Sequence, residues 1–219
     1  PTRRSSDLNT KAIIMHTESA MESLPTRDTA PATLAGQLTA TWAVVGFTII
    51  LLQALYRLYP MVQTMLDKHP LQWWHWALIV LWMAFMGYSE GYKGFQKAFS
   101  PRFAARARWL KYYPGGVLRT LFAPFFCMGF FGATKKRKIV AWVLNIGIVL
   151  IILVIRQLSQ PWRGIVDTGV LLGLTWGLLS VLFFCFQTLI QDQPGVGPEV
   201  SDVELQRKAL IESATPALS

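Results

Sequence analysis

The sequence predicts an all-α membrane protein with four transmembrane helices, a basic amphipathic helix and one re-entrant or interfacial segment. The chain has 219 residues, of which 53% are hydrophobic and only 15% are charged. Several apolar runs are near the roughly 20 residues that a helix needs to cross a hydrocarbon core about 30 Å thick. Lys and Arg gather beside these runs, as they do on the cytoplasmic side of membrane proteins. The alternative is five transmembrane helices.

The N-terminal part, before the first apolar run, predicts no membrane segment. The first eight residues, PTRRSSDL, are one translation frame of a common sequencing-library adapter, so we expect 1–14 to be a non-native leader. The authentic chain would then begin at Met15 or Met21. Residues 15–36 are rich in Thr, Ala, Ser and Pro without an apolar period, and they predict a disordered tail.

The membrane domain is expected over 37–190, and its first two spans over 37–58 and 73–92. The first run carries no charge before Arg57, and a loop containing Pro60 and Pro70 follows it. The second run begins with three Trp, the composition of an interfacial aromatic belt. Within that belt we interpret His75 as a hydrogen-bonding group rather than a ligand.

Glu90 lies at the end of the second run, three residues before Lys93. Side chains at this spacing are neighbours on an α-helix, so we expect an ion pair at the membrane edge. The alternative is a functional ionisable group that couples to a proton or a cation.

A basic helix follows from Ser100 to about Tyr113, with Pro101 at its expected first position. Apolar residues share one face and cations occupy the rest, the pattern of a helix that lies on a membrane surface. A helix that binds a soluble partner has the same pattern. With the cluster after the next apolar run, its cations are the candidate contacts for lipid headgroups: Arg102, Arg106, Arg108, Lys111, Lys135, Lys136, Arg137 and Lys138.

The run 115–134 is long enough to span but contains Arg119 and Pro124. If it spanned, the cations on its two flanks would face opposite compartments, against the positive-inside rule. We therefore favour a re-entrant or interfacial segment broken at Pro124. The five-span alternative treats it as a full span.

The last two spans are expected over 139–158 and 164–190. The last span has glycines at every fourth position: Gly169, Gly173 and Gly177. This spacing predicts a close helix contact, and its partner is either an internal helix or a second copy of the chain. Asp167 needs a cationic partner near the bilayer, and Arg163 or Arg156 is the expected one. Together these residues form a candidate polar cluster at the membrane edges: Glu90, Lys93, Arg156, Arg163 and Asp167.

Residues 191–219 predict a polar tail with a short helix near 202–211, because Ser201 and Glu204 match a capping box. The distribution of Lys and Arg orients the whole chain. The two outer loops carry four of these residues and the central block carries eleven, which predicts cytoplasmic N- and C-termini.

Three stretches resemble an uncharacterised family of bacterial inner-membrane proteins: EGYKGFQKAFSPR, APFFCMGFFGATKKR and PWRGIVDTG. The resemblance covers most of the region from the second span to the last. It implies the bacterial inner membrane as the location. No activity is known for that family, so no catalytic residue carries over.

These observations favour a non-enzymatic protein whose cationic cytoplasmic loop contacts the lipid bilayer through anionic phospholipid headgroups, or contacts a partner protein. The alternative is a subunit of a small-solute or ion transporter or channel, with the Pro124 segment as its pore element. An enzyme is disfavoured because Glu90 and Asp167 are expected on opposite membrane faces. We expect no cofactor, no metal site and no nucleic-acid binding, since no motif accompanies the net charge of +9.

Overall fold

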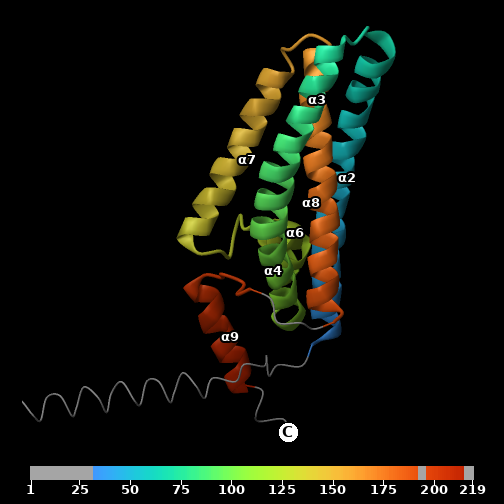
Figure 1. The fold of residues 1–219 in the computed structure, drawn as a ribbon. Helices are drawn as coiled ribbons and strands as arrows, with labels where there is room; N and C mark the ends of the chain where they lie inside the picture. Colours follow the sequence, from blue (N-terminus) through green and yellow to red (C-terminus); the bar gives the residue numbers. More distant parts are fainter. Residues whose placement is uncertain (1–31, 192–195, 215–219) are drawn as a thin grey trace, which may run out of the picture.

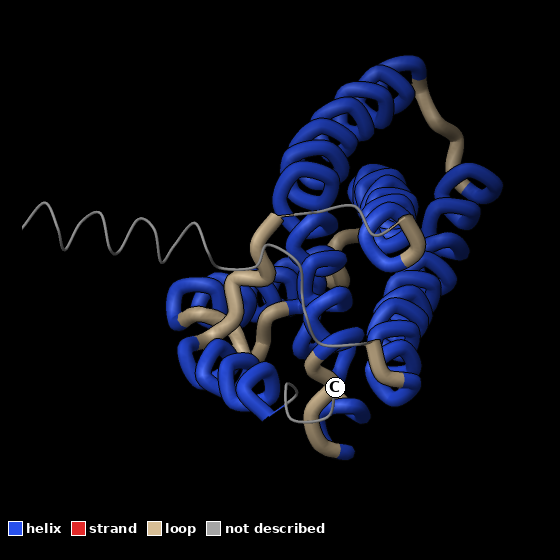
Figure 2. Tube along the Cα trace, turned by 90° about the horizontal axis from the view of Figure 1, so that it is seen from below, coloured by secondary structure: helices blue, strands red, loops and turns tan. Residues whose placement is uncertain are grey.

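The computed structural model describes residues 32–191 and 196–214, and every regular element within them is a helix (Figure 2). The expected leader 1–14 and almost all of the expected tail 15–36 lie outside the described residues. The all-α class is confirmed for the described part.

The first described helix, α2 (Leu34–Lys68), is longer than predicted. It begins at Thr33, whose Oγ1 accepts a hydrogen bond of 3.1 Å from the Gly36 amide. The predicted end at residue 58 was wrong, because α2 continues through Pro60 to Lys68. A proline removes its own amide hydrogen bond and its ring crowds the carbonyl four residues earlier, but the turns beyond Pro60 are held because Met65 is buried.

The next three elements form one uninterrupted rod, α3 (Trp73–Met86), η1 (Gly87–Phe99) and α4 (Ser100–Tyr112). Figure 1 shows this rod in green, beside α2 and α8. The middle element is a π-helix, whose hydrogen bonds join residues five apart. The α-helix predicted to begin near Ser100 is confirmed as α4, but the predicted N-cap at Ser100 was wrong, since the rod passes through that residue without a break.

Helix α4 does not lie alone on a surface, which corrects the expected membrane-surface helix. The apolar residues that share its face are at most 1% exposed, and α4 packs against α2 and α8: Phe103, Ala107 and Leu110. An apolar face of this kind fits a protein core as well as a membrane surface, so periodicity alone did not choose between them.

The segment 115–134 forms two short helices, α5 (Val117–Leu121) and α6 (Ala123–Met128), which meet at Phe122. At 1.5 Å per residue, the six residues of α6 reach only about 9 Å. The five-span alternative is therefore wrong, because this segment forms no helix that could cross a bilayer. Pro124 lies in the first turn of α6, as expected for the point where the run is broken.

The remaining helices are α7 (Lys135–Ile155), α8 (Trp162–Leu189) and α9 (Asp202–Ala214). No residue of α7 is buried, and Figure 1 shows α7 standing beside the bundle rather than within it. The starts of α2 and α7 and the end of α8 lie at one end of the bundle, and the α2–α3 and α7–α8 turns lie at the other.

Within the described residues, three helices are long and apolar enough to cross a membrane, namely α2, α7 and α8. The predicted second span is not among them, because α3 has only 14 residues before η1 begins. The larger core cluster lies between α2, α4, α6 and α8, where the Phe47 ring packs on Phe99 and Phe103 at centroid distances of 5.2 and 4.7 Å.

Candidate functional site

At one end of the bundle, the C-terminal segment before α9 docks on α4, α6 and the start of α7. Val200 is buried and pairs with Ala133 in an isolated β-bridge. The Thr134 amide donates to the Glu199 carbonyl at 3.3 Å, and the Ser201 amide donates to the Gly132 carbonyl at 3.0 Å. We call this region the basic junction, defined by four arginines and two glutamates: Arg102, Arg106, Arg119, Arg137, Glu199 and Glu204.

Arg106 is the centre of the basic junction and is only 3% exposed. Its Nη1 donates to the Phe126 carbonyl at 2.9 Å, within the buried interior. Its Nε and Nη2 donate to the carbonyls of Pro198 and Glu199, each at 3.0 Å. Burial lowers the pKa of this guanidinium from its ordinary value, but the three carbonyls solvate the charge and join α4 to α6 and the C-terminal segment.

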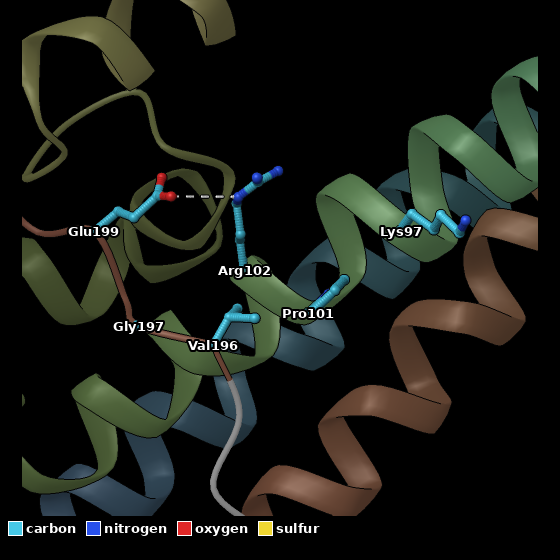
Figure 3. A pocket seen from close by; sticks show the side chains of 6 residues that line it. All are labelled: Lys97, Pro101, Arg102, Val196, Gly197 and Glu199. Carbon is cyan, nitrogen blue, oxygen red and sulfur yellow. Dashed lines mark ion pairs between the residues drawn. The ribbon is translucent and has the colours of Figure 1, made fainter.

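The Glu199 carboxylate lies between two further arginines. It accepts hydrogen bonds from the Nε and Nη2 of Arg137, at the start of α7, and it lies 3.5 Å from the Nε of Arg102. The hydrogen bond from Arg137 lowers the pKa of Glu199 below its ordinary value. Figure 3 shows Arg102 and Glu199 meeting across a pocket of about 180 Å³, which Lys97 also lines.

A second ion pair joins α9 to α5. The Arg119 Nη1 lies 2.7 Å from the Glu204 Oε2, and the two side chains are only 10% and 15% exposed. The Lys208 ammonium lies over the rings of Trp109 and Tyr113, at 5.7 and 5.6 Å from the two centroids. The predicted helix after Ser201 is confirmed, and these contacts hold it against the rest of the protein.

The eight cations expected at lipid headgroups fall into different environments. The predicted headgroup contact of Arg106 is corrected, because this side chain is buried and donates its hydrogen bonds to backbone carbonyls. Arg102 and Arg137 contact Glu199, and the Lys111 Nζ donates to the Leu189 carbonyl at the end of α8. Arg108 is half-buried and lies beside the ring of Tyr112. Three cations in the first turn of α7 are exposed: Lys135, Lys136 and Lys138.

The glycine ladder of α8 packs against the α3–η1 rod. A Cβ atom added to Gly173 would lie 2.9 Å from the Glu90 Oε2, and one added to Gly177 would lie 2.6 Å from the Phe95 ring. Gly169 is covered in the same way by Trp82. Of the partners that the sequence left open for this face, the structure places side chains of the same chain against it.

Glu90 does not form the expected ion pair with Lys93. The reason is η1, in which residues five apart replace residues three and four apart as hydrogen-bonded neighbours. The Lys93 ammonium accordingly lies over the ring of Tyr88, five residues earlier, at 4.8 Å from its centroid. The Glu90 Oε2 is buried without a hydrogen-bond partner among the described residues.

At the opposite end of the bundle, the Arg163 Nε lies 3.8 Å from the Asp167 Oδ2. Arg163 was one of the two partners expected for Asp167, and Arg156, the other, is exposed. His75 acts as the expected hydrogen-bonding group, since its Nδ1 accepts from the Gln72 amide at 3.0 Å. The sequence analysis placed Glu90 and Lys93 apart from Arg156, Arg163 and Asp167, and the structure likewise places the two groups on different elements.

The sequence analysis missed the two carboxylates of the basic junction, Glu199 and Glu204. The available signal was their charge, because they are acidic residues in a chain whose central block carries eleven cations. Sequence alone does not bring these carboxylates near the arginines that contact them, which lie 62 to 97 positions earlier.

The described residues contain no group of three or more His, Cys, Asp or Glu that is placed to hold a metal ion. Burial strongly raises the pKa of the Cys127 thiol, so its thiolate, the nucleophilic form, is disfavoured. Comparisons with protein-family models, with curated proteins and with solved structures find no match to this chain.

Proposed function

We propose that this chain is a multi-pass protein of the bacterial inner membrane whose cationic cytoplasmic end binds anionic phospholipid headgroups. The proposal includes four spans, formed by α2, the α3–η1 rod, α7 and α8, with both termini in the cytoplasm. It involves no enzymatic reaction.

The fourth span is supported by the continuity of the rod and by its surface. Helix α3 continues into η1 without a break, so the helical length does not end at Met86. Large apolar side chains on α3 are exposed, including Val80 at 66%, Leu81 at 68% and Phe85 at 55%. Exposed apolar side chains at this density favour contact with lipid chains.

The observation that carries the headgroup proposal is the first turn of α7. Lys135, Lys136 and Lys138 are exposed there, and that turn contains no acidic residue. The amide end of a helix disfavours cations by about 0.3–1 kcal/mol each. A nearby anionic surface attracts each one by about 1 kcal/mol. Lipid phosphates at this turn would therefore offset the unfavourable helix-end charge.

The body of α7 supports the same proposal. It has the highest hydropathy of the three candidate spans, and none of its most apolar window is buried within the chain. A helix of this composition is stable when lipid surrounds it, and its basic turn then lies at the depth of the headgroups. The Arg102–Glu199–Arg137 contacts fix this turn next to α4.

The test compares bound lipids in native mass spectrometry. The wild-type protein and a K135Q/K136Q/K138Q variant are purified in detergent with equal amounts of phosphatidylglycerol and phosphatidylcholine. We expect the wild type to retain phosphatidylglycerol preferentially and the variant to lose most of that preference. The matched control is R156Q, which removes an exposed cation at the other end of α7 and is expected to keep the preference.

Three results would overturn the proposal: a variant that keeps the wild-type preference, equal loss in R156Q, and a wild type without any lipid preference. The third result would direct attention to a partner protein as the ligand of the basic turn.

A further inference from the structure

The π-helix η1 places one carboxyl group in the middle of the helix bundle. Glu90 lies against Gly173 of α8, where the missing side chain leaves room for it. Gly173 is eleven residues from the start of α8 and sixteen from its end, which correspond to about 16 and 24 Å. The carboxyl group therefore lies far from both ends of a predicted span rather than at its edge.

The packing on both sides of Glu90 is apolar or aromatic. Toward one end of α8, Trp82 and Met86 cover Gly169. Toward the other end, Phe95 covers Gly177, and Trp176 of α8 lies against Gly91 of η1. These contacts separate the carboxyl group from the two ends of the bundle along the α8 interface.

No cation neutralises Glu90 in the part of the chain that the structure describes. The Lys93 and Lys97 ammonium groups lie over the rings of Tyr88 and Tyr92, five residues before each. On α8, Asp167 is six residues before Gly173, about 9 Å along the axis, and it is paired with Arg163. The other titratable groups on elements packed against η1 are engaged elsewhere or buried in the core: His75 on α3, Arg102, Arg106, Arg108, Lys111 and Tyr112 on α4, and Cys185 on α8.

We propose that Glu90 is a reversible proton-binding site in the interior of the membrane domain. An unpaired carboxylate at this depth costs several kcal/mol, and binding a proton removes the charge. The step is the transfer of one proton between water and a carboxylate oxygen, and it needs no other reactant. The π-helix supports a functional interpretation because such segments are frequent at functional sites and rare elsewhere.

This site does not depend on the headgroup proposal. It lies on η1 and α8, whereas the basic turn lies on α7, and the described structure contains no substantial packing between α7 and either element. The site does rest on the proposed membrane span of the α3–η1 rod, but the headgroup contact of α7 and the proton site can each fail while the other stands.

The test is infrared difference spectroscopy between acidic and alkaline pH, on the full chain in phosphatidylcholine vesicles. We expect the wild type to show the C=O stretch of a protonated carboxylic acid that converts to carboxylate bands as the pH rises. Because the chain has twelve Asp and Glu residues in all, the component assigned to Glu90 is the part of this signal that is lost in E90Q and kept in D167N, the control for a second carboxyl group of the bundle. An E90Q spectrum identical to that of the wild type would overturn the proposal, as would a Glu90 carboxylate that stays ionised at every pH.

A second variant keeps the test decisive if E90Q fails to fold. In G173A, the added Cβ would lie 2.9 Å from the Glu90 Oε2, so the carboxyl group must move while remaining present. We expect the midpoint of the carboxyl titration to shift. G147A is the control, because no atom lies within 4 Å of its added Cβ. An unchanged midpoint in G173A would contradict the proposed location.

Discussion

Replacing Arg106 by Met should release the C-terminal segment from the bundle while leaving the helices in place. Arg106 is only 3% exposed, and its three hydrogen bonds end on carbonyls of Phe126, Pro198 and Glu199. Methionine keeps most of the apolar length of the side chain and removes all three donors. The change therefore tests the hydrogen bonds more than the packing.

The magnitude follows from the burial of each bond. A hydrogen bond to a charged group contributes about 1.5–3 kcal/mol. The bonds to Pro198 and Glu199 are part-buried, so water replaces much of what is lost there. The two part-buried bonds that hold the segment, discounted to about 0.5–1 kcal/mol each, give about 1–2 kcal/mol for its opening, whereas the buried bond to Phe126 joins α4 to α6. A loss of about 1–2 kcal/mol corresponds to roughly 5- to 30-fold more frequent opening of the segment.

Hydrogen–deuterium exchange measures this opening directly. The Thr134 and Ser201 amides bond across the basic junction, and we expect both to exchange faster in R106M by the factor above. The control is K136M, which removes an exposed cation that makes no hydrogen bond or ion pair to the described part of the segment. Unchanged exchange at both amides in a folded R106M protein would refute the role assigned to Arg106.

Two further predictions concern other contacts. In G177A the added Cβ would lie 2.6 Å from the Phe95 ring, so we expect a loss of about 1–3 kcal/mol in stability from overpacking, measured as a lower unfolding midpoint in detergent and absent in G147A. A wild-type midpoint in G177A would show that η1 and α8 do not pack as described. Arg137 lowers the pKa of Glu199. The ionised Glu199 carboxylate therefore stabilises the basic junction at pH values above the ordinary carboxyl pKa, and this stabilisation is lost as the pH falls through the lowered pKa. After correction for the intrinsic exchange rate, exchange at the Thr134 amide should therefore be faster in acid in the wild type, and E199Q should not show this acceleration. The same acid response in E199Q would exclude Glu199 as its source.

The sequence was sufficient for the helical class and for the positions of the last two long helices. Continuous apolar runs specify such helices locally, and α7 and α8 begin and end within four residues of their predicted bounds. The end of α2 was missed because Pro60 was interpreted as the start of a loop. The buried contact of Met65 with Gly164, a hundred residues away in the chain, holds the helix beyond that proline.

The candidate sites were harder to predict because they depend on long-range contacts and on an unusual backbone. The spacing of Glu90 and Lys93 indicates an ion pair only in an α-helix, and η1 is a π-helix. Arg106 belongs to an amphipathic pattern, but its carbonyl partners are 20, 92 and 93 positions away. The glycine ladder did predict a close helix contact, but its partner was identified only by the three-dimensional structure.

The orientation of the bundle is the central claim, and single-cysteine accessibility in intact bacterial cells tests it most directly. Cys127 and Cys185 are buried and can remain in place. One added cysteine replaces Lys136, in the first turn of α7, and another replaces Ser159, in the turn between α7 and α8. With a membrane-impermeant maleimide, we predict labelling of S159C from outside and protection of K136C until the membrane is opened. Labelling of K136C in intact cells, with S159C protected, would place the cationic end outside the cytoplasm and contradict the account.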